Sequence, residues 1–181
     1  MEATYGAAME ENWEKMVNYY KEHIEYFSFP VTETLDTVLH LAIHSNEEQP
    51  LKDLLEIMKK RELPLTDQTE FLKKKNEFGN TALHEATIYG NYEAVRLLVE
   101  RCPELLSIPN EFGETPLFTA AGFAKTEIVE FLIRHKPEQC VDDNGRLLRT
   151  HSKRSVPSGD DLSILSAAIL GKKFGNNSSL Y

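Results

Sequence analysis

Two histidines one helical turn apart are the first residues whose types and spacing could do chemistry. His40 and His44 stand four positions apart in the segment HLAIH, so a helix would place both imidazoles on one face. The zinc-protease motif uses two histidines at this spacing, but it needs a glutamate directly after the first and a third ligand elsewhere. The residue after His40 is Leu41, and no third ligand is evident. We therefore expect neither a metal nor a cofactor.

Other catalytic signatures are also missing from the sequence. It contains no nucleophile elbow, no phosphate-binding glycine loop and no dinucleotide fingerprint. Cys102 and Cys140 lack C-x-x-C spacing, so neither a zinc site nor a disulfide framework is indicated. We expect a protein that is not an enzyme. A hydrolase or metalloenzyme is the weaker alternative, because catalytic triads can assemble from residues far apart in sequence.

Composition narrows the classes of partner and compartment. The 181 residues carry a formal net charge of -9, with 41% hydrophobic and 27% charged residues. Binding to nucleic acid depends on a surplus of Lys and Arg, so no nucleic-acid partner is expected. The N-terminus lacks a basic and apolar leader, and no run of about 18 apolar residues occurs. We expect a cytoplasmic protein with no membrane span.

The elements that must position these residues come from an internal repeat. The segment NEFGNTALHEATIYGNYEAVRLLVE, residues 76–100, is nearly restated as NEFGETPLFTAAGFAKTEIVEFLIR from Asn110. The register is set by Thr81 and Thr115, which are 115 − 81 = 34 positions apart. A period in this range predicts a stacked-repeat architecture.

Each copy predicts a turn followed by two short antiparallel helices. Asn and Gly in the NEFG segments favour the turn, and Thr81 and Thr115 stand where a helix N-cap belongs. Gly90 is a suitable C-cap. Such short helices are marginal alone, so stacking is needed to bury their apolar faces. The stripe expected to be buried on the second helix is Ala94, Val95, Leu98 and Val99.

Weaker copies flank these two. An upstream copy begins at Thr37, 81 − 37 = 44 positions before Thr81, and the ten-residue surplus predicts an extended loop near 60–69. A downstream copy begins at Ser163 and lacks a second helix. Before all copies, an amphipathic helix is expected to cover the N-terminal end of the stack through Trp13, Met16, Val17 and Tyr20. The incomplete last copy would leave apolar residues poorly covered, namely Ile164, Leu165, Ile169 and Leu170.

The repeated segments resemble a known family. TVLHLA, TALHEA and TPLFTA begin at Thr37, Thr81 and Thr115, and they resemble the ankyrin signature T-P-L-H-x-A. Longer segments, including ENWEKMVNYYKEH and VPSGDDLSILSAAILG, resemble plant ankyrin proteins of the accelerated-cell-death type, and this resemblance extends over roughly residues 12–172. Those relatives usually end in a PGG membrane domain, whose apolar segments do not occur here. The resemblance implies an all-α ankyrin-repeat solenoid of stacked helix-turn-helix units with β-turn tips.

The chain departs from the ankyrin pattern at four places. Leu35 replaces a turn glycine and Ala124 replaces a C-cap glycine, while Phe118 and Ser166 replace the signature histidine. The resulting organisation is a disordered N-terminus (1–11), a capping helix (12–30), repeat 1 (31–59), an insertion (60–75), repeat 2 (76–109), repeat 3 (110–137), a basic mobile loop (138–159), an incomplete repeat 4 (160–172) and a disordered tail (173–181).

In the ankyrin framework the signature histidines His40 and His84 are structural, each bridging a threonine hydroxyl and neighbouring backbone. The resemblance further implies non-enzymatic protein binding in plant stress or defence signalling, at the cytoplasmic face of the plasma membrane through partners. The alternative is a self-associating or regulatory short form of a membrane-anchored ankyrin protein, joined through its uncapped C-terminal repeat. Protein partners are expected on a concave face, contacting Phe78, Asn80, Glu85, Ile88, Tyr89, Phe112, Glu114, Thr119 and Phe123. Phe78 and Phe112 have a second interpretation, in which they only pack turn against turn.

A basic island lies in the loop before the last copy. It includes Arg149, Lys153 and Arg154 in an otherwise acidic chain. Basic residues beside serine suit a basic-directed kinase, so Ser152 and Ser155 are candidate phosphorylation sites. The alternative is a solvated loop with no regulatory role.

Overall fold

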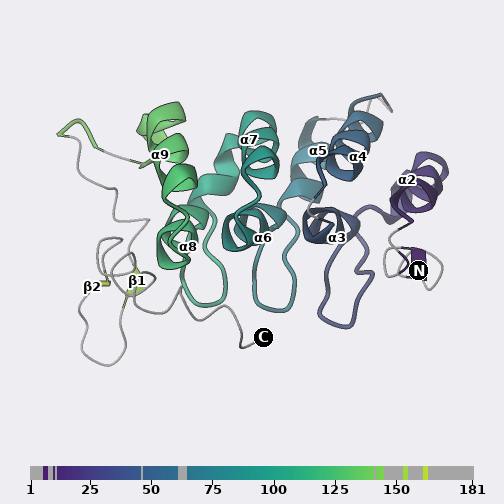
Figure 1. Ribbon diagram of the computed structural model, residues 1–181, viewed down its shortest axis with the longest axis horizontal. Helices are drawn as coiled ribbons and strands as arrows, with labels where there is room; N and C mark the ends of the chain where they lie inside the picture. The colour runs from purple at the N-terminus through teal and green to yellow at the C-terminus, as the bar shows by residue number, and fades with distance from the viewer. Residues whose placement is uncertain are drawn as a thin grey trace.

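The helices of the protein stack side by side in two rows (Figure 1). This computed structural model describes residues 6–7, 10, 12–45, 47–60, 65–140, 142–144, 153–154 and 161–162. We call the two rows the outer helices and the inner helices. The outer helices are α2 (Trp13–Glu22), α4 (Glu48–Lys60), α7 (Tyr92–Arg101) and α9 (Thr126–His135). The inner helices are α3 (Val38–His44), α6 (Ala82–Tyr89) and α8 (Pro116–Gly122). The predicted all-α stack of helix pairs is confirmed.

Other elements follow the outer helices in the sequence. After the outer helices come the 3-10 helix η1 (Ile24–Tyr26), the helix α5 (Leu65–Leu72), the 3-10 helix η2 (Pro103–Ser107) and the helix α10 (Pro137–Cys140). Two two-residue strands, β1 (Lys153–Arg154) and β2 (Asp161–Leu162), pair antiparallel with Lys153 opposite Leu162.

The predicted extended loop between the first two repeats is wrong in part, because the insertion contains α5. This helix has apolar residues to bury: Leu72 is 2% exposed, and the Phe71 ring lies 6.0 Å from that of Phe27. The surplus residues therefore contribute to the core instead of forming only a connection.

Each inner helix begins at its predicted threonine. The Thr81 side chain accepts the amide of His84, and the His84 ring accepts the amide of Thr81, which closes a capping box. Thr37 and His40 repeat this arrangement at the start of α3. In α8 the Thr115 side chain accepts from the Phe118 amide, but phenylalanine cannot return a bond as histidine does. The local start signals read from the sequence are confirmed.

The stack has one continuous apolar interior. Leu83, Val95 and Leu117 are fully buried in it, and Val129 packs against it half-buried. The predicted stripe of α7 is buried as a whole. On α2, Met16, Val17 and Tyr20 are buried and Trp13 packs half-buried against the core, and α2 lies against α4. In Figure 1, α2 takes the place of one more outer helix.

At two positions where the residue type departs from the ankyrin pattern, the backbone conformation is the one that the pattern requires. Leu35 and Ala124 have φ of +62° and +56°, the left-handed region that Gly79 and Gly90 occupy at the equivalent places. A side chain in this region is disfavoured by about 1 to 2 kcal/mol per residue. The surrounding stack therefore imposes the turn even where the sequence does not favour it.

Several sequence-based expectations lie outside the described residues. These are the phosphorylation candidates Ser152 and Ser155, and the apolar residues of the incomplete repeat, namely Ile164, Leu165, Ile169 and Leu170. The tail 173–181 and most of segment 1–11 also lie outside them.

Candidate functional site

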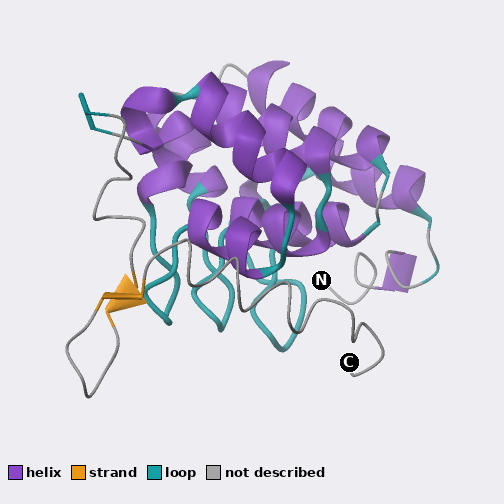
Figure 2. Ribbon diagram, turned by 60° about the vertical axis from the view of Figure 1, so that its left-hand side comes forward, coloured by secondary structure: helices purple, strands orange, loops and turns teal. Residues whose placement is uncertain are grey.

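Three five-residue turns, which we call the tips, project from the stack beside the inner helices (Figures 1 and 2). Tip 1 is residues 32–36, tip 2 is 76–80 and tip 3 is 110–114. In tip 2 the Asn76 amide donates to the Asn80 carbonyl at 2.9 Å, and tip 3 repeats this bond between Asn110 and Glu114 at 2.9 Å. Gly79 allows the reversal with φ of +72°. The tips are thus closed turns with fixed backbones.

Backbone hydrogen bonds join successive tips. The Glu77 amide donates to the Thr34 carbonyl at 2.9 Å, and the Glu111 amide donates to the Phe78 carbonyl at 3.0 Å. These bonds place the second residue of one tip beside the third residue of the tip before it. The three tips therefore form one connected edge of the molecule.

Side-chain amides make a second link between the tips. The Asn76 side chain donates to the Asp36 carboxylate at 2.9 Å, and the Asn110 side chain donates to the Asn80 side-chain oxygen at 2.9 Å. All four residues are buried. The repeated Asn therefore serves the stack as well as its own turn.

The signature histidines hold each inner helix to the next tip. In both rings Nδ1 accepts from the preceding threonine, so the proton is on Nε2. The Nε2 of His40 donates to the Asn80 carbonyl at 2.9 Å, and that of His84 donates to the Glu114 carbonyl at 3.0 Å. Burial lowers the pKa of His84 to about 4 and also lowers the pKa of His40. The structural role predicted for both histidines is confirmed.

A buried carboxylate lies between tips 1 and 2. Glu85 accepts from the side-chain amides of Asn76 at 3.0 Å and Asn80 at 2.9 Å, and its other oxygen is 3.7 Å from His44 Nε2. Burial alone would raise the pKa of Glu85, but the interactions with His44, Asn80 and Asn76 outweigh it, so the pKa is lowered. Glu85 is held ionised inside the protein.

Three of the residues expected at the partner surface are instead internal. Asn80 and Glu85 are each 7% exposed and bond to each other, while Asn80 also accepts from Asn110 of tip 3 and Glu85 accepts from Asn76. Thr119 is 2% exposed, and its hydroxyl lies 2.7 Å from that of Thr87 on the adjacent inner helix. The expectation that these three side chains are available to a partner is wrong. Ile88 and Glu114 are half-buried.

The remaining expected residues are large, apolar and exposed. Phe78 is 45% exposed and Phe112 is 56% exposed, each at the third position of its tip. Tyr89 at 57% and Phe123 at 50% stand at equivalent places, where α6 and α8 end. We call this surface the tip face: the tips together with the exposed residues of the inner helices and their C-terminal caps. Sequence reasoning missed Leu35, which is 48% exposed on tip 1.

Tyr89 connects the helix ends with the tips. Its ring centroid is 5.0 Å from that of His44, across the boundary between repeats 1 and 2. Burial raises its pKa, and so do the carboxylates of Glu85 and Asp36. Tyr89 therefore lies over the buried network and not apart from it.

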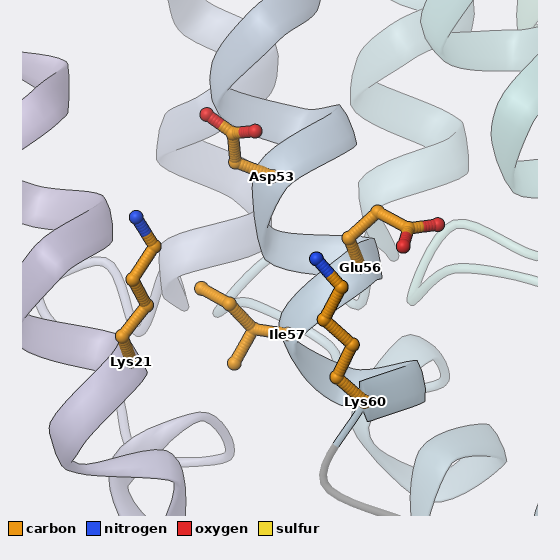
Figure 3. A pocket seen from close by; sticks show the side chains of 5 residues that line it. All are labelled: Lys21, Asp53, Glu56, Ile57 and Lys60. Atoms are coloured by element: carbon orange, nitrogen blue, oxygen red, sulfur yellow. The ribbon is translucent and has the colours of Figure 1, made fainter.

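The grooves of the outer helices have a different character. Figure 3 shows one between α2 and α4, lined by Lys21 of α2 and by Asp53, Glu56, Ile57 and Lys60 of α4. It combines both signs of charge with a single apolar side chain and contains no nucleophile beside a base. We therefore find no catalytic arrangement in this groove.

The described residues also offer no metal centre, since no three His, Cys, Asp or Glu side chains among them are grouped to hold an ion. Both cysteines are free and buried, and burial raises the pKa of Cys102 and Cys140 to about 11. Such thiols are poor nucleophiles. In the same described part, no helix has the length and apolarity to cross a membrane.

Comparison with known proteins agrees with this architecture. A family profile described as "Ankyrin repeats (3 copies)" matches residues 6–105, and one described as "Ankyrin repeat" matches 112–140. No curated protein sequence gives a significant match. A chain of the crystal structure of the yeast ribosomal protein Rps3 in complex with its chaperone Yar1 is similar, with a TM-score of 0.63 and 25% identity over 72% of this chain and 89% of that chain. The repeat profile covers more than half of the sequence and the helix pairs stack as repeats, so the chain belongs to the ankyrin-repeat family.

Proposed function

We propose that this chain is a non-enzymatic protein-recognition module that contacts its partner through the tip face. One observation carries the proposal. Of the seven large hydrophobic residues exposed in the described part of the chain, five lie on this face, namely Leu35, Phe78, Tyr89, Phe112 and Phe123. The outer helices contribute none of the seven.

These aromatic side chains are not needed by the core, which is complete beneath them. The interior is filled by fully buried residues such as Leu83 and Leu117, and the tips are fixed by their own hydrogen bonds. Exposed aromatic residues on a rigid surface are typical anchors of protein interfaces, because they bury a large area with little loss of side-chain freedom. The similar structure from yeast is a complex between a chaperone and a ribosomal protein, which supports a protein partner for this fold.

The test uses binding peptides as a defined probe. Peptides are selected on the full chain from a displayed random library, and their affinity is measured by fluorescence anisotropy. We expect the double variant Tyr89→Ala, Phe123→Ala to weaken binding by roughly 1 to 4 kcal/mol. Its helical circular dichroism and unfolding midpoint stay near those of the parent, because both side chains are about half exposed.

The chain offers a matched control in Tyr26 and Phe29, another exposed Tyr and Phe pair, located in the N-terminal segment. The variant Tyr26→Ala, Phe29→Ala is expected to bind as the parent does. If both double variants lose affinity equally, or if neither loses affinity, the tip face is not the binding surface. A sharp drop in the unfolding midpoint of the Tyr89→Ala, Phe123→Ala variant would show that these residues belong to the core.

The cellular role we propose is signalling in plant stress or defence, with the protein held at the cytoplasmic side of the plasma membrane by its partners. This proposal rests on the sequence resemblance to plant ankyrin proteins. Fractionation of the native protein before and after salt or pathogen challenge tests it. The proposal requires a partner-dependent membrane fraction that changes with the stimulus, and an unchanging soluble pool would contradict it.

Self-association is the alternative use of the exposed apolar surface. Sedimentation across a wide concentration range separates the two. A concentration-dependent dimer that the Tyr89 and Phe123 substitutions dissociate would favour self-association, and a constant monomer would favour a different partner.

A further inference from the structure

Of the four residue types Asp, Glu, Lys and Arg, only Asp and Glu occur in the segments that form the tip face. The three segments that form it, residues 31–44, 76–89 and 110–123, contain no lysine or arginine, so all 20 Lys and Arg lie elsewhere in the sequence. The same segments contain six carboxylates: Glu33, Asp36, Glu77, Glu85, Glu111 and Glu114. These segments are therefore anionic, with histidine as their only basic residue type. Two lysines lie at their borders, where Lys75 Nζ donates to the Pro109 carbonyl at 2.7 Å and the Lys125 side chain lies beside Gly90.

The exposed carboxylates form a row. Glu33, Glu77 and Glu111 occupy the second position of each tip, and all three are exposed. Because the Glu77 amide bonds to Thr34 and the Glu111 amide bonds to Phe78, each glutamate follows the preceding tip directly in space. The row alternates along the edge with the exposed rings of Phe78 and Phe112.

The carboxylates buried beneath the row do not reduce the negative charge of the face. Asp36 and Glu85 are buried and accept hydrogen bonds from neutral asparagine amides. The His44 Nε2 lies 3.7 Å from a Glu85 carboxylate oxygen. The pKa of Glu85 is lowered, so its charge persists at neutral pH and adds to the negative potential of the face.

Several charges on the outer helices are matched locally. Lys52 pairs with Glu48, Arg96 pairs with both Glu93 and Glu100, and Arg134 pairs with Glu130. Charges paired within one helix produce little field at a distance, whereas a surface of one sign attracts an oppositely charged partner. Electrostatic attraction therefore directs a cationic partner to the tip face.

We infer that the partner segment bound by the tip face is basic, an extended stretch rich in Lys and Arg that runs across the three tips. Guanidinium and ammonium groups pair with carboxylates and also lie favourably on aromatic faces. The alternating row of glutamates and phenylalanines offers both contacts. This inference rests on the proposed function and specifies the chemistry of its partner.

The peptides selected above also test the inference, through their composition and salt dependence. We expect them to be enriched in Lys and Arg relative to the unselected library. We also expect their affinity to fall about tenfold or more between about 0.05 M and 0.5 M NaCl, because screening weakens exposed charge pairs. The triple variant Glu33→Gln, Glu77→Gln, Glu111→Gln should weaken binding by about tenfold as well.

A charge-matched control keeps the result specific. Glu14, Glu56 and Glu130 are exposed on α2, α4 and α9, and their replacement by Gln changes the net charge by the same amount. This control should bind within about twofold of the parent. Equal loss in both triple variants would show that net charge alone acts and would overturn the inference.

The two proposals fail in distinguishable ways. Selected peptides that are neutral or acidic, yet depend on Tyr89 and Phe123, would overturn the basic partner and leave the recognition face standing. Basic peptides that ignore Tyr89, Phe123 and the tip glutamates would overturn both. Circular dichroism of each variant separates loss of binding from loss of fold.

Discussion

At the residue scale, one position shows how side-chain chemistry serves the stack. His40 and His84 each satisfy a threonine and the backbone of the next tip, with both ring nitrogens used. Phe118 occupies the same place in repeat 3 and is buried without polar partners for its ring. The histidines must be neutral to work, because protonated Nδ1 could no longer accept from the threonine amide.

This requirement predicts acid sensitivity. The pKa of His84 is lowered from 6.5 to about 4, so the unfolded chain binds more protons than the folded protein between these values. The stability that His84 contributes is complete above pH 6.5 and is lost as the pH falls toward 4, by about 3 kcal/mol. The pKa of His40 is also lowered, so His40 likewise contributes stability that is lost as the pH falls. The pKa of Glu85 is lowered from 4.5, so this carboxyl adds a loss only at still lower pH.

Urea unfolding at pH 7, 6, 5 and 4.5 measures the effect, with His84→Gln as control. Glutamine keeps an acceptor for the capping box but does not titrate, so the variant should show a shallower decline over this range. If the free energy of unfolding declines equally in the parent and the variant, His84 is not the source of the acid sensitivity.

The sequence was informative at this scale where a residue acts within its own repeat. The bond between Thr81 and His84 spans three positions, and the repeat signature predicted it. It was not informative for Asn80, Glu85 and Thr119, whose surroundings include the neighbouring tip or inner helix. Their local sequence resembles that of exposed turn and helix residues, so only the stacked structure reveals their position.

At the element scale, the tips behave as one edge because each is built against the next. Gly79 and Gly113 have nearly the same backbone, with φ of +72° and +73°. Their surroundings differ. A Cβ at Gly79 would lie 2.4 Å from the Glu111 amide nitrogen, whereas a Cβ at Gly113 would meet no described atom within 4 Å.

The pair gives a matched test of tip stacking. Gly113→Ala should lower the free energy of unfolding by about 1 to 2 kcal/mol through backbone strain alone. Gly79→Ala adds a clash with the neighbouring backbone and threatens the bond from Glu111 to Phe78, so it should cost about 2 to 4 kcal/mol. Denaturant unfolding of both variants measures the difference, and equal losses would show that the tips are independent turns.

Elements inside a repeat were predictable, and elements between repeats were not. The inner and outer helices follow from caps and from apolar stripes such as that of α7. Helix α5 escaped prediction because its packing partner, Phe27, lies more than forty positions away, and no periodic signal links Phe71 to it.

At the scale of the whole molecule, the outer helices and the tip face differ in the residues that they expose. The shared interior makes the stack stable, and the outer helices carry locally paired charges. The tip face gathers exposed aromatic residues and unbalanced negative charge on one side. The fold class followed from the 34-residue period, whereas the composition of this face emerged only when burial separated exposed residues from internal ones.

Hydrogen–deuterium exchange of the full chain, with and without a selected peptide, tests the central claim most directly. At short labelling times, we expect slower exchange in segments 32–36, 76–80 and 110–114 and at the ends of α6 and α8. Exchange in α2, α4, α7 and α9 should be unchanged over the same times. Protection confined to the outer helices, with unchanged tips, would contradict the assignment of the tip face as the binding surface.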